Sequence, residues 1–382
     1  MMQILLSAGE ASGDYYGAQL IQSLQQLAPG TKFFGMGGDR MRAARCELLV
    51  NASEVAVVGL AEVVTHLPAI RKKFKSIIHE AKKRRPQAAV LIDFPDFNLR
   101  LARHLHRLQI PVFYFVSPQV WAWRSSRVKQ IRKYVRKIIV IFPFEQDFYR
   151  RHGVEVRYVG HPLAYASEPS ISREEFAARY GLDPAKEWIA LLPGSRKKEV
   201  QMNLPPMLEV AQQLGAQYQY LVPVASTLKG EWLRQQFPPS GAVIKLTVNS
   251  RLTLKHSRAG VVASGTATVE AALAGSPFVV VYRLASLTWL LGRRLVNLDT
   301  FAMVNLIAGR RIVTELIQHD FTAANVVREL SAIIPDGPRR QHMLADLKEV
   351  QQRLRDSAST VEPSMRAAEE ILAGLPELPA AN

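Results

Sequence analysis

Short apolar runs alternate with longer amphipathic stretches along the whole chain. The runs have the length of buried strands, and turn-forming residues bound many of them. Strands are predicted at residues 3–7, 32–35, 88–92, 112–116 and 137–141, and then at 188–192, 218–222, 242–246, 260–262 and 278–282. Helices are predicted between them, for example at residues 15–27, 174–180, 208–214 and 268–274. Strands interleaved with helices predict an α/β fold with parallel sheets joined by right-handed crossovers.

The strands fall into two sets, which predicts two Rossmann-like domains. The polar stretch 160–172 contains two prolines, so the boundary is expected there. We assign residues 1–165 to an N-terminal domain and residues 166–340 to a C-terminal domain. The pattern then becomes helical and charged, and residues 341–382 are expected to form C-terminal helices with a frayed tail. Because ligands of open α/β sheets bind beyond the carboxyl ends of the strands, the loops there carry the candidate chemistry.

Composition adds a strong positive charge. The chain has 49 Lys and Arg against 33 Asp and Glu, a formal net charge of +16. This excess implies an anionic partner, which is a nucleic acid, an acidic membrane surface or a phosphorylated substrate. The single cysteine, Cys46, excludes an intrachain disulfide, and we interpret it as a buried structural thiol in a cytoplasmic protein. No uninterrupted apolar run reaches the about 18–20 residues of a membrane span, and the N-terminus lacks a signal-peptide pattern.

The loop after the first strand reads Ser-Ala-Gly-Glu-Ala-Ser-Gly-Asp. Gly9 and Gly13 allow a tight turn, and Ser12 or Asp14 is expected to cap the following helix. A capped turn explains these residues without any function, but it does not explain Glu10, an acid at the sheet edge. The loop lacks the Gly-x-Gly-x-x-Gly pattern, so no dinucleotide cofactor is predicted.

The loop at residues 91–98 contains two carboxylates three residues apart, Asp93 and Asp96, with aromatic residues around them. Aromatic neighbours reduce the solvation of a carboxylate, which raises its pKa and makes it a better general base. An acidic first helical turn explains Asp96 equally well. For Asp93, at the very end of a strand, the catalytic interpretation is stronger.

The loop at residues 116–124 places two tryptophans one residue apart, between Gln119 and Arg124. Trp121 and Trp123 could form the wall of a site for a sugar or an acyl group. Core packing explains either tryptophan alone equally well.

Two loops of the second domain have the composition of phosphate-binding loops. After one strand, Gly194 permits close backbone approach, Ser195 offers a hydroxyl, and Arg196 can bind phosphate oxygens. After another, the small residues 263–268 open a helix whose amides can hold an anion, and Glu270 lies one turn into that helix, where it can accept from a ribose diol. Neither loop matches the Walker pattern, and the histidines lack zinc-ligand spacing, so neither a kinase nor a zinc site is predicted.

Taken in order, these motifs resemble those of lipid-A-disaccharide synthases. The matching segments are residues 8–14, 92–98, 116–124, 191–196, 263–270, 305–310 and 313–318. The resemblance extends over roughly residues 3 to 320, and its most specific element is Ser-Pro-x-Val-Trp-Ala-Trp. The chain departs from the family pattern at Val304 and Thr314, where proline is usual, and at Gln119, where serine is usual.

The resemblance implies a GT-B architecture, in which two Rossmann-like domains face each other across a cleft and C-terminal helices cross back to the N-terminal domain. It implies an inverting transfer of 2,3-diacylglucosamine from UDP to the C6 hydroxyl of 2,3-diacylglucosamine 1-phosphate (lipid X). It also implies a homodimer, in which residues 341–382 are exchanged or pack on the N-terminal domain. No cofactor is expected. No obligatory metal is expected either, because helix N-termini and Arg196 can stabilise the departing UDP without a divalent ion.

By resemblance, Asp93 is the expected general base, with Glu10 and Asp96 as supporting acids. The residues expected to bind UDP are Gly194, Ser195, Arg196, Ser264, Gly265, Thr266, Glu270 and Asn305. The residues expected to bind the acceptor or sugar are Ser12, Gln119, Trp121, Trp123 and Arg124.

Acylated substrates require work at a membrane surface, and one segment has the required character. Its apolar residues lie beside a basic run, which suits peripheral binding to the anionic inner face of the inner membrane. The expected membrane residues are Val58, Leu60, Val63, Val64, Leu67, Arg71, Lys72 and Lys73. For the basic part alone, an ordinary amphipathic helix with a solvated charged face is nearly as good an interpretation.

Two rival functions agree with part of this pattern. A basic nucleic-acid-binding protein fits the net charge, but the chain lacks a recognised nucleic-acid motif, and its cations are not interleaved with stacking aromatics. Another UDP-sugar enzyme of the same architecture, either an epimerase of UDP-N-acetylglucosamine or a transferase with a soluble acceptor, fits the loops. The apolar stretch at residues 55–67 disfavours it, because a soluble acceptor does not require such a stretch.

Overall fold

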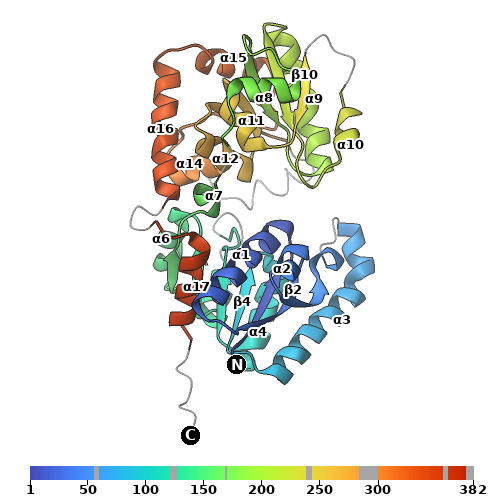
Figure 1. Ribbon diagram of the computed structural model, residues 1–382, viewed down its shortest axis with the longest axis vertical. Coiled ribbons are helices and arrows are strands. Elements are labelled where there is room, and N and C mark those ends of the chain that lie inside the picture. Colours follow the sequence, from blue (N-terminus) through green and yellow to red (C-terminus); the bar gives the residue numbers. More distant parts are fainter. Residues whose placement is uncertain are drawn as a thin grey trace. The chain divides into compact units, whose positions relative to one another are not determined.

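The computed structural model describes residues 1–55, 68–120, 127–167, 170–237, 243–283, 300–355 and 360–375, together with the backbone of the helix that begins at Leu60. The chain forms two compact units (Figure 1). The first contains residues 1–165 and 356–382, and the second contains residues 166–355. Each unit is an α/β structure with a parallel sheet, as predicted.

The sheet of the first unit has seven strands in the order β3-β2-β1-β4-β5-β6-β7. They are β1 (Gln3–Ala8), β2 (Lys32–Gly37), β3 (Cys46–Asn51), β4 (Ala88–Ile92), β5 (Val112–Phe115), β6 (Lys137–Val140) and β7 (Val156–Tyr158). All five strands predicted in this unit are present, whereas β3 and β7 were not predicted. Both lie at an edge of the sheet and are only partly buried, so their sequences lack a continuous apolar run.

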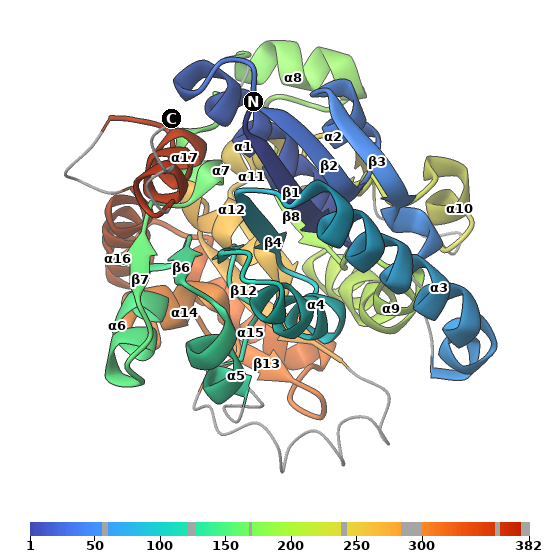
Figure 2. The same ribbon diagram turned by 90° about the horizontal axis from the view of Figure 1, so that it is seen from below.

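Helices cover both faces of this sheet, which explains why its central strands are apolar at every position. The helices are α1 (Ala11–Leu27), α2 (Asp39–Ala43), the 3-10 turn η1 (Ala52–Glu54), α3 (Leu60–Arg84), α4 (Pro95–Arg107), α5 (Arg127–Tyr134), α6 (Pro143–Arg151), α7 (Pro162–Tyr165) and α17 (Pro363–Ala373). Alternate residues of β1 enter opposite core layers: Leu5 packs with α3, α4 and α5, and Ile4 and Leu6 pack with α1 and α17. Figure 2 shows α17 beside α1.

Cys46 lies buried in β3, as expected of a structural thiol. Burial, followed by the nearby Glu47 and Asp14 carboxylates, raises the pKa of the Cys46 thiol to about 12. A thiol with so high a pKa stays protonated near neutral pH, so it is a poor nucleophile.

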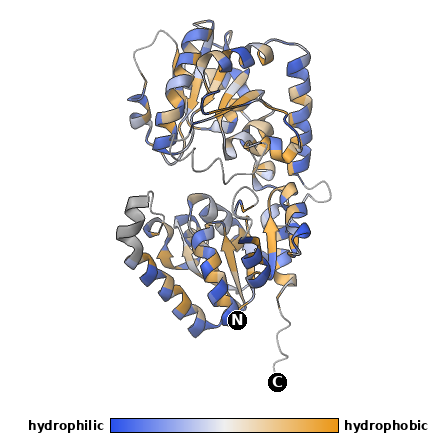
Figure 3. Cartoon of the chain, turned by 180° about the vertical axis from the view of Figure 1, so that it is seen from behind, coloured by the Kyte–Doolittle hydropathy of each residue, from blue (hydrophilic) through white to orange (hydrophobic). Residues whose placement is uncertain are grey.

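The sheet of the second unit has six strands in the order β10-β9-β8-β11-β12-β13. They are β8 (Glu187–Leu192), β9 (Tyr218–Pro223), β10 (Ile244–Thr247), β11 (Ala259–Ala263), β12 (Phe278–Tyr282) and β13 (Glu315–Ile317). The helices are α8 (Arg173–Tyr180), α9 (Lys197–Leu214), α10 (Gly230–Arg234), α11 (Ser250–His256), α12 (Thr266–Ala274), α14 (Met303–Ala308), α15 (Ala323–Ile333) and α16 (Pro338–Leu354). Figure 3 shows apolar strands inside each unit and polar residues on the outer helix faces.

The C-terminal helices divide between the two units. Helix α16 packs on α12 and α14 in the second unit. Helix α17 returns to the first unit, where Ala367, Ala368 and Ile371 join the core and Arg366 donates to the carbonyl of Val159 at 3.0 Å. The residues from 341 onward are therefore divided between the two units.

Both sheets reverse their strand order at a central pair of strands. In the first unit the reversal lies between β1 and β4, and in the second between β8 and β11. At such a switch point the connections leave in opposite directions and open a crevice beyond the carboxyl ends of the strands. The loops containing Glu10 and Asp93 follow β1 and β4, and those containing Ser195 and Thr266 follow β8 and β11. The candidate residues therefore stand at the two places that favour ligand binding.

Candidate active site

Asp93 stands directly after β4 in a strained turn. Asp93 and Phe94 both have left-handed backbones, with φ of 45° and 51°. Non-glycine residues rarely adopt this conformation, and such strain persists where surrounding contacts hold it. Here the Asp93 amide donates to the carbonyl of Val116 at 3.2 Å, and the Asp93 carbonyl accepts from the Tyr114 hydroxyl at 2.6 Å. The turn is therefore fixed from both sides.

The Asp93 carboxyl is a stronger base than an ordinary aspartate. Burial, followed by the nearby negative charge of Glu10, raises its pKa to about 6, while a hydrogen bond from the Phe94 backbone acts in the opposite direction. The raised pKa of Asp93 that was predicted from weak solvation of its carboxylate is therefore present. At neutral pH the group is mostly ionised, so it is ready to accept a proton.

Asn98, on the buried face of α4, ties the loops of β1 and β4 together. Its side-chain amide donates to the carbonyls of Ser7, Ile92 and Asp93 at 3.1, 3.1 and 2.8 Å, and its oxygen accepts from the Ser7 hydroxyl at 2.7 Å. The side chain is fully buried. No role was predicted for Asn98. Its position between Phe97 and Leu101 on the apolar face of an amphipathic helix indicates a buried polar contact.

Gly9 allows the β1 loop to lie against the Phe94 ring. A β-carbon at Gly9 would stand 2.2 Å from Phe94 Cδ1, a distance that real atoms do not tolerate. Glycine is thus required here by close packing rather than by a ligand. This contact sets the Glu10 loop directly beside the Asp93 turn.

The expected cap of α1 is wrong. Helix α1 has Glu10 at its N-cap position, without a side-chain hydrogen bond, and Ser12 is an exposed residue of the first turn. Asp14 lies one full turn into α1, too far along to cap it. Its carboxylate instead caps α2, accepting from the amides of Gly38, Arg40 and Met41 at 2.7, 3.1 and 3.1 Å.

The remaining candidates of the first unit are more exposed. Asp96 is an exposed residue of the first turn of α4 and forms an ion pair with Arg127 at the start of α5. Gln119 is exposed beyond the end of β5. The predicted acceptor residues Trp121, Trp123 and Arg124 lie outside the described residues.

In the second unit, α12 begins with an open N-terminus. Gly265 is its N-cap residue, with φ of 143° and no side-chain cap, and a β-carbon there would meet nothing within 4 Å. Gly265 and Thr266 are both exposed. Ser264 is anchored by its hydroxyl, which donates to the carbonyl of Phe301 at 3.2 Å. The first-turn amides and the positive end of the helix dipole therefore suit an anion.

In the loop at residues 194–196, a side chain of the same segment already binds the free backbone amides. The Glu199 carboxylate accepts from the amides of Ser195 and Arg196 at 3.0 and 3.2 Å. A β-carbon at Gly194, whose φ is 123°, would lie 2.7 Å from Glu199 Cβ. Gly194 thus makes room for Glu199. The Arg196 guanidinium pairs with the Glu199 carboxylate at 3.4 Å, and its side chain is 68% exposed.

Glu270 lies one turn into α12, as predicted, and its carboxylate accepts from the Ser250 hydroxyl at 2.5 Å. Ser250 is the first residue of α11. The carboxylate is therefore held near the start of two helices, on the side of the sheet that carries the open N-terminus of α12.

Asn305 is placed differently from the expectation that it borders a nucleotide. Its side chain is fully buried, and its amide donates to the Val313 carbonyl and to Glu315 at 3.0 and 2.7 Å. Its oxygen accepts from the amides of Ile312 and Val313 at 2.8 and 3.0 Å. Because the amide and the oxygen of Asn305 already form these hydrogen bonds, the side chain holds the segment before β13 in place.

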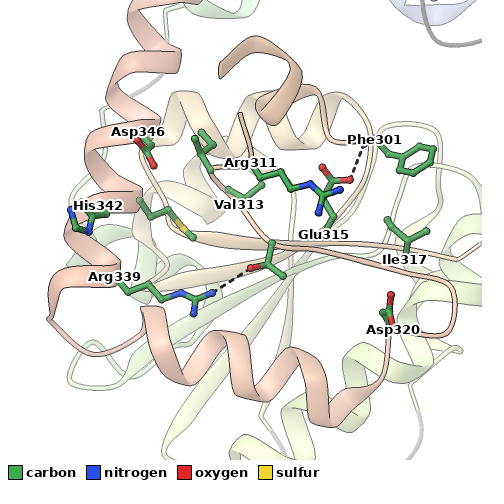
Figure 4. Close-up of a pocket in the computed structure, with 12 residues that line it drawn as sticks. Phe301, Arg311, Val313, Glu315, Ile317, Asp320, Arg339, His342 and Asp346 are labelled. Atoms are coloured by element: carbon green, nitrogen blue, oxygen red, sulfur yellow. Dashed lines mark hydrogen bonds between the residues drawn. The ribbon is translucent and has the colours of Figure 1, made fainter. Parts of the chain in front are cut away.

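A cavity of about 520 Å³ lies between this segment, β13 and α16 (Figure 4). Its polar side chains are largely paired: Glu315 accepts from the amide of Phe301 at 2.8 Å, and Arg339 donates to Thr314 Oγ1 at 3.4 Å. The cavity borders the edge strand of the sheet, and no residue of the two phosphate-type loops lines it.

Comparison with known proteins identifies the family. The family model described as lipid-A-disaccharide synthetase matches residues 4–369. A lipid-A-disaccharide synthase of Koribacter versatilis is 54% identical over 97% of this chain and 98% of its own length. One of Acidobacterium capsulatum is 48% identical over 97% and 96% of the two chains.

The chain belongs to the lipid-A-disaccharide synthase family.

A solved structure supports the fold of this synthase-family member. The glycotransferase of kitacinnamycin superposes with a TM-score of 0.65 at 15% identity, covering 98% of this chain and 99% of the other. The fold is thus that of the GT-B glycosyltransferases, and the family makes the chain a glycosyltransferase, as the resemblance implied.

The predicted membrane segment of this synthase-family member falls partly outside the described residues. Val58 and the side chains of Leu60, Val63, Val64 and Leu67 lie there. On α3, Arg71 and Lys72 are exposed, whereas Lys73 forms an ion pair with Glu54. In the described part of the chain, no helix has the length and apolar character of a membrane span.

Proposed function

We propose that this chain transfers 2,3-diacylglucosamine from UDP to the C6 hydroxyl of 2,3-diacylglucosamine 1-phosphate (lipid X), with inversion at C1. The products are the β-1′,6-linked tetra-acyl disaccharide 1-phosphate and UDP. The observation that carries the proposal is a strained aspartate of raised pKa at the β1–β4 switch point of a chain that belongs to this family.

Asp93 acts as the general base. As O6 of the acceptor attacks C1 of the donor sugar, the O6 proton passes to the Asp93 carboxylate, and the bond from C1 to the UDP oxygen breaks with its electron pair on UDP. A base near pKa 6 accepts this proton better than an ordinary aspartate while staying ionised at neutral pH. Glu10 contributes through its charge, which raises the pKa of Asp93.

The departing UDP gains negative charge, which the second unit is suited to stabilise. The open N-terminus of α12, at Gly265 and Thr266, offers amides and the positive end of a helix dipole. Arg196 offers an exposed guanidinium that can bind two phosphate oxygens. Since UDP leaves as a stable anion, this chain needs no acid to protonate it.

A transfer assay tests the proposal directly. Purified protein is incubated with UDP-2,3-diacylglucosamine and the 1-phosphate acceptor, and products are separated by mass spectrometry. Equal amounts of disaccharide 1-phosphate and UDP support the proposal. Epimerisation of UDP-N-acetylglucosamine, or transfer only to a soluble acceptor, would favour the rival UDP-sugar enzyme instead.

Glu270 is proposed to accept hydrogen bonds from the ribose diol. Glu270→Ala is expected to weaken UDP binding by roughly tenfold, the effect of losing hydrogen bonds to a charged group, and to leave pyrophosphate binding unchanged. Calorimetric titration with both ligands measures this difference. Equal weakening of UDP and pyrophosphate binding would contradict the ribose contact. An equal loss of UDP affinity in Ser250→Ala would assign the effect to the hydrogen bond between Ser250 and Glu270.

We propose that the protein binds peripherally to the anionic inner face of the inner membrane. Arg71 and Lys72 are exposed on α3, which continues from the apolar segment, so charge and apolar character are close in sequence. Lys73 contributes less, because it is paired with Glu54.

Replacing Val58, Leu60 and Val64 together with serine is expected to reduce the fraction bound to anionic liposomes several-fold, because apolar area no longer enters the interface. Flotation of the variant and the wild type with the same vesicles measures this fraction. Unchanged flotation would move the membrane contact to another surface.

We also propose that the protein works as a homodimer, as the resemblance to the family implies. The supporting feature is the path of the C-terminal segment, which places α16 with the second unit and α17 with the first. A path of this kind allows the terminal helix to be exchanged between two copies.

A further inference from the structure

A pocket of about 320 Å³ lies between α4 and α5. From α4 it is lined by Arg100 and Arg103, which are three residues apart and so share one helix face. From α5 it is lined by Arg127, Gln130 and Tyr134, whose spacing likewise places them on one face. Two helices thus direct three guanidinium groups, an amide and a phenol toward one space.

The charge in this pocket is only partly neutralised. Arg127 forms an ion pair with Asp96, which also lines the pocket. Arg100 and Arg103 are exposed, and neither forms a salt bridge or a side-chain hydrogen bond with any residue that the structure describes. Two unpaired cations three residues apart on a helix repel each other. A bound anion would offset that repulsion.

The donor set matches a phosphate group. Guanidinium groups bind phosphate oxygens in pairs, and the Gln130 amide and the Tyr134 hydroxyl offer further donors. The Tyr134 ring is held edge-on against His106, with ring centroids 5.5 Å apart. The pocket also borders the site, since Pro95 and Asp96, which line it, follow Asp93 by two and three residues.

We propose that the α4–α5 pocket binds an organic phosphate, with Arg100 and Arg103 holding its oxygens. Two sources share this chemistry. One is the 1-phosphate of the acceptor, and this source rests on the proposed function. The other is the headgroup of an anionic phospholipid, which would seat this unit on the membrane.

The test compares the wild type with R100Q/R103Q and with a matched control, R107Q/R151Q, which removes the same charge from exposed residues that do not line the pocket. The first arm measures kcat and KM in detergent, with the 1-phosphate acceptor and with the same acceptor lacking phosphate. The second arm measures binding to phosphatidylcholine vesicles with and without phosphatidylglycerol.

If the acceptor supplies the phosphate, R100Q/R103Q raises KM for the phosphorylated acceptor by roughly tenfold or more, and kcat and the KM of the dephosphorylated acceptor stay near those of the control. If a phospholipid supplies it, R100Q/R103Q loses binding to phosphatidylglycerol vesicles by a similar factor, and both KM values stay unchanged. Equal behaviour of the two double variants in both arms would overturn the proposal. Absence of transfer by the wild type would refute the proposed function. Vesicle binding alone would then test whether the pocket binds a phosphate group.

Discussion

Asp93→Asn is expected to lower kcat by about 10²–10⁴-fold, the usual contribution of a general base, while leaving the Kd of UDP nearly unchanged. Asparagine keeps the size of the side chain and the hydrogen bonds of the Asp93 backbone, but it cannot accept the acceptor proton. The proposed UDP contacts lie on the second sheet, so they are preserved. Single-turnover transfer kinetics and calorimetric titration with UDP measure the two effects.

Stability supplies an independent check on the same variant. Because the folded state raises the pKa of Asp93 above its ordinary value, this carboxyl favours folding at low pH, and its contribution is lost as pH rises through about 6. Asp93→Asn should therefore unfold at a higher temperature than the wild type at pH above 6, with the difference shrinking in acid. Asp147→Asn, at an exposed residue of α6, is the matched control and should change neither activity nor this difference. Lost UDP binding in Asp93→Asn would refute the assignment of Asp93 as base.

Asn98→Asp is expected to destabilise the protein by roughly 3–5 kcal/mol at neutral pH, the cost of an uncompensated buried charge. The wild-type amide donates to the carbonyls of Ser7, Ile92 and Asp93, and a carboxylate in its place would face these oxygens without a proton to donate. Activity should also fall, because the Asp93 turn loses one of its supports. Urea denaturation followed by circular dichroism measures the loss.

The pH dependence of this variant separates charge from shape. The introduced carboxyl would have a raised pKa, so its destabilising effect should grow as pH rises through that pKa and shrink in acid, where it is protonated. An unfolding midpoint equal to that of the wild type at neutral pH would show that the Asn98 network does not hold the two loops.

The sheets were largely predictable because their central strands are buried on both faces. Such strands are apolar at every position, as in 88–92 and 278–282, and this pattern needs no knowledge of the partners. The strands that were not predicted, β3, β7 and β13, are edge strands with partly exposed residues. Their conformation depends on pairing with a neighbour that is distant in sequence.

The position of the site was also predictable, but its internal contacts were not. The rule that ligands bind beyond the carboxyl ends of strands was enough to select Glu10, Asp93 and the residues before α12. It could not show that Glu199 occupies the amides of the Ser195 loop, or that Asn305 is buried, since both facts depend on side-chain directions. The pocket at Arg100 and Arg103 requires the packing of α4 against α5, which no local pattern contains.

The pH dependence of kcat/KM tests the central claim, that Asp93 is the base, most directly. This parameter reports the ionisation of groups in the free enzyme and in the free substrates, and the acceptor phosphate also titrates at a pH of about 6. The shift expected in Glu10→Gln therefore assigns the inflection to Asp93 and not to the phosphate. The rate should rise with pH along an acid limb with its inflection near 6, because Asp93 must lose its proton to act. In Glu10→Gln the inflection should move to lower pH, because the neighbouring negative charge that raises the Asp93 pKa is gone. A profile that is flat from about pH 5 to 7, or whose inflection lies at the ordinary aspartate value of about 4, would contradict the assignment.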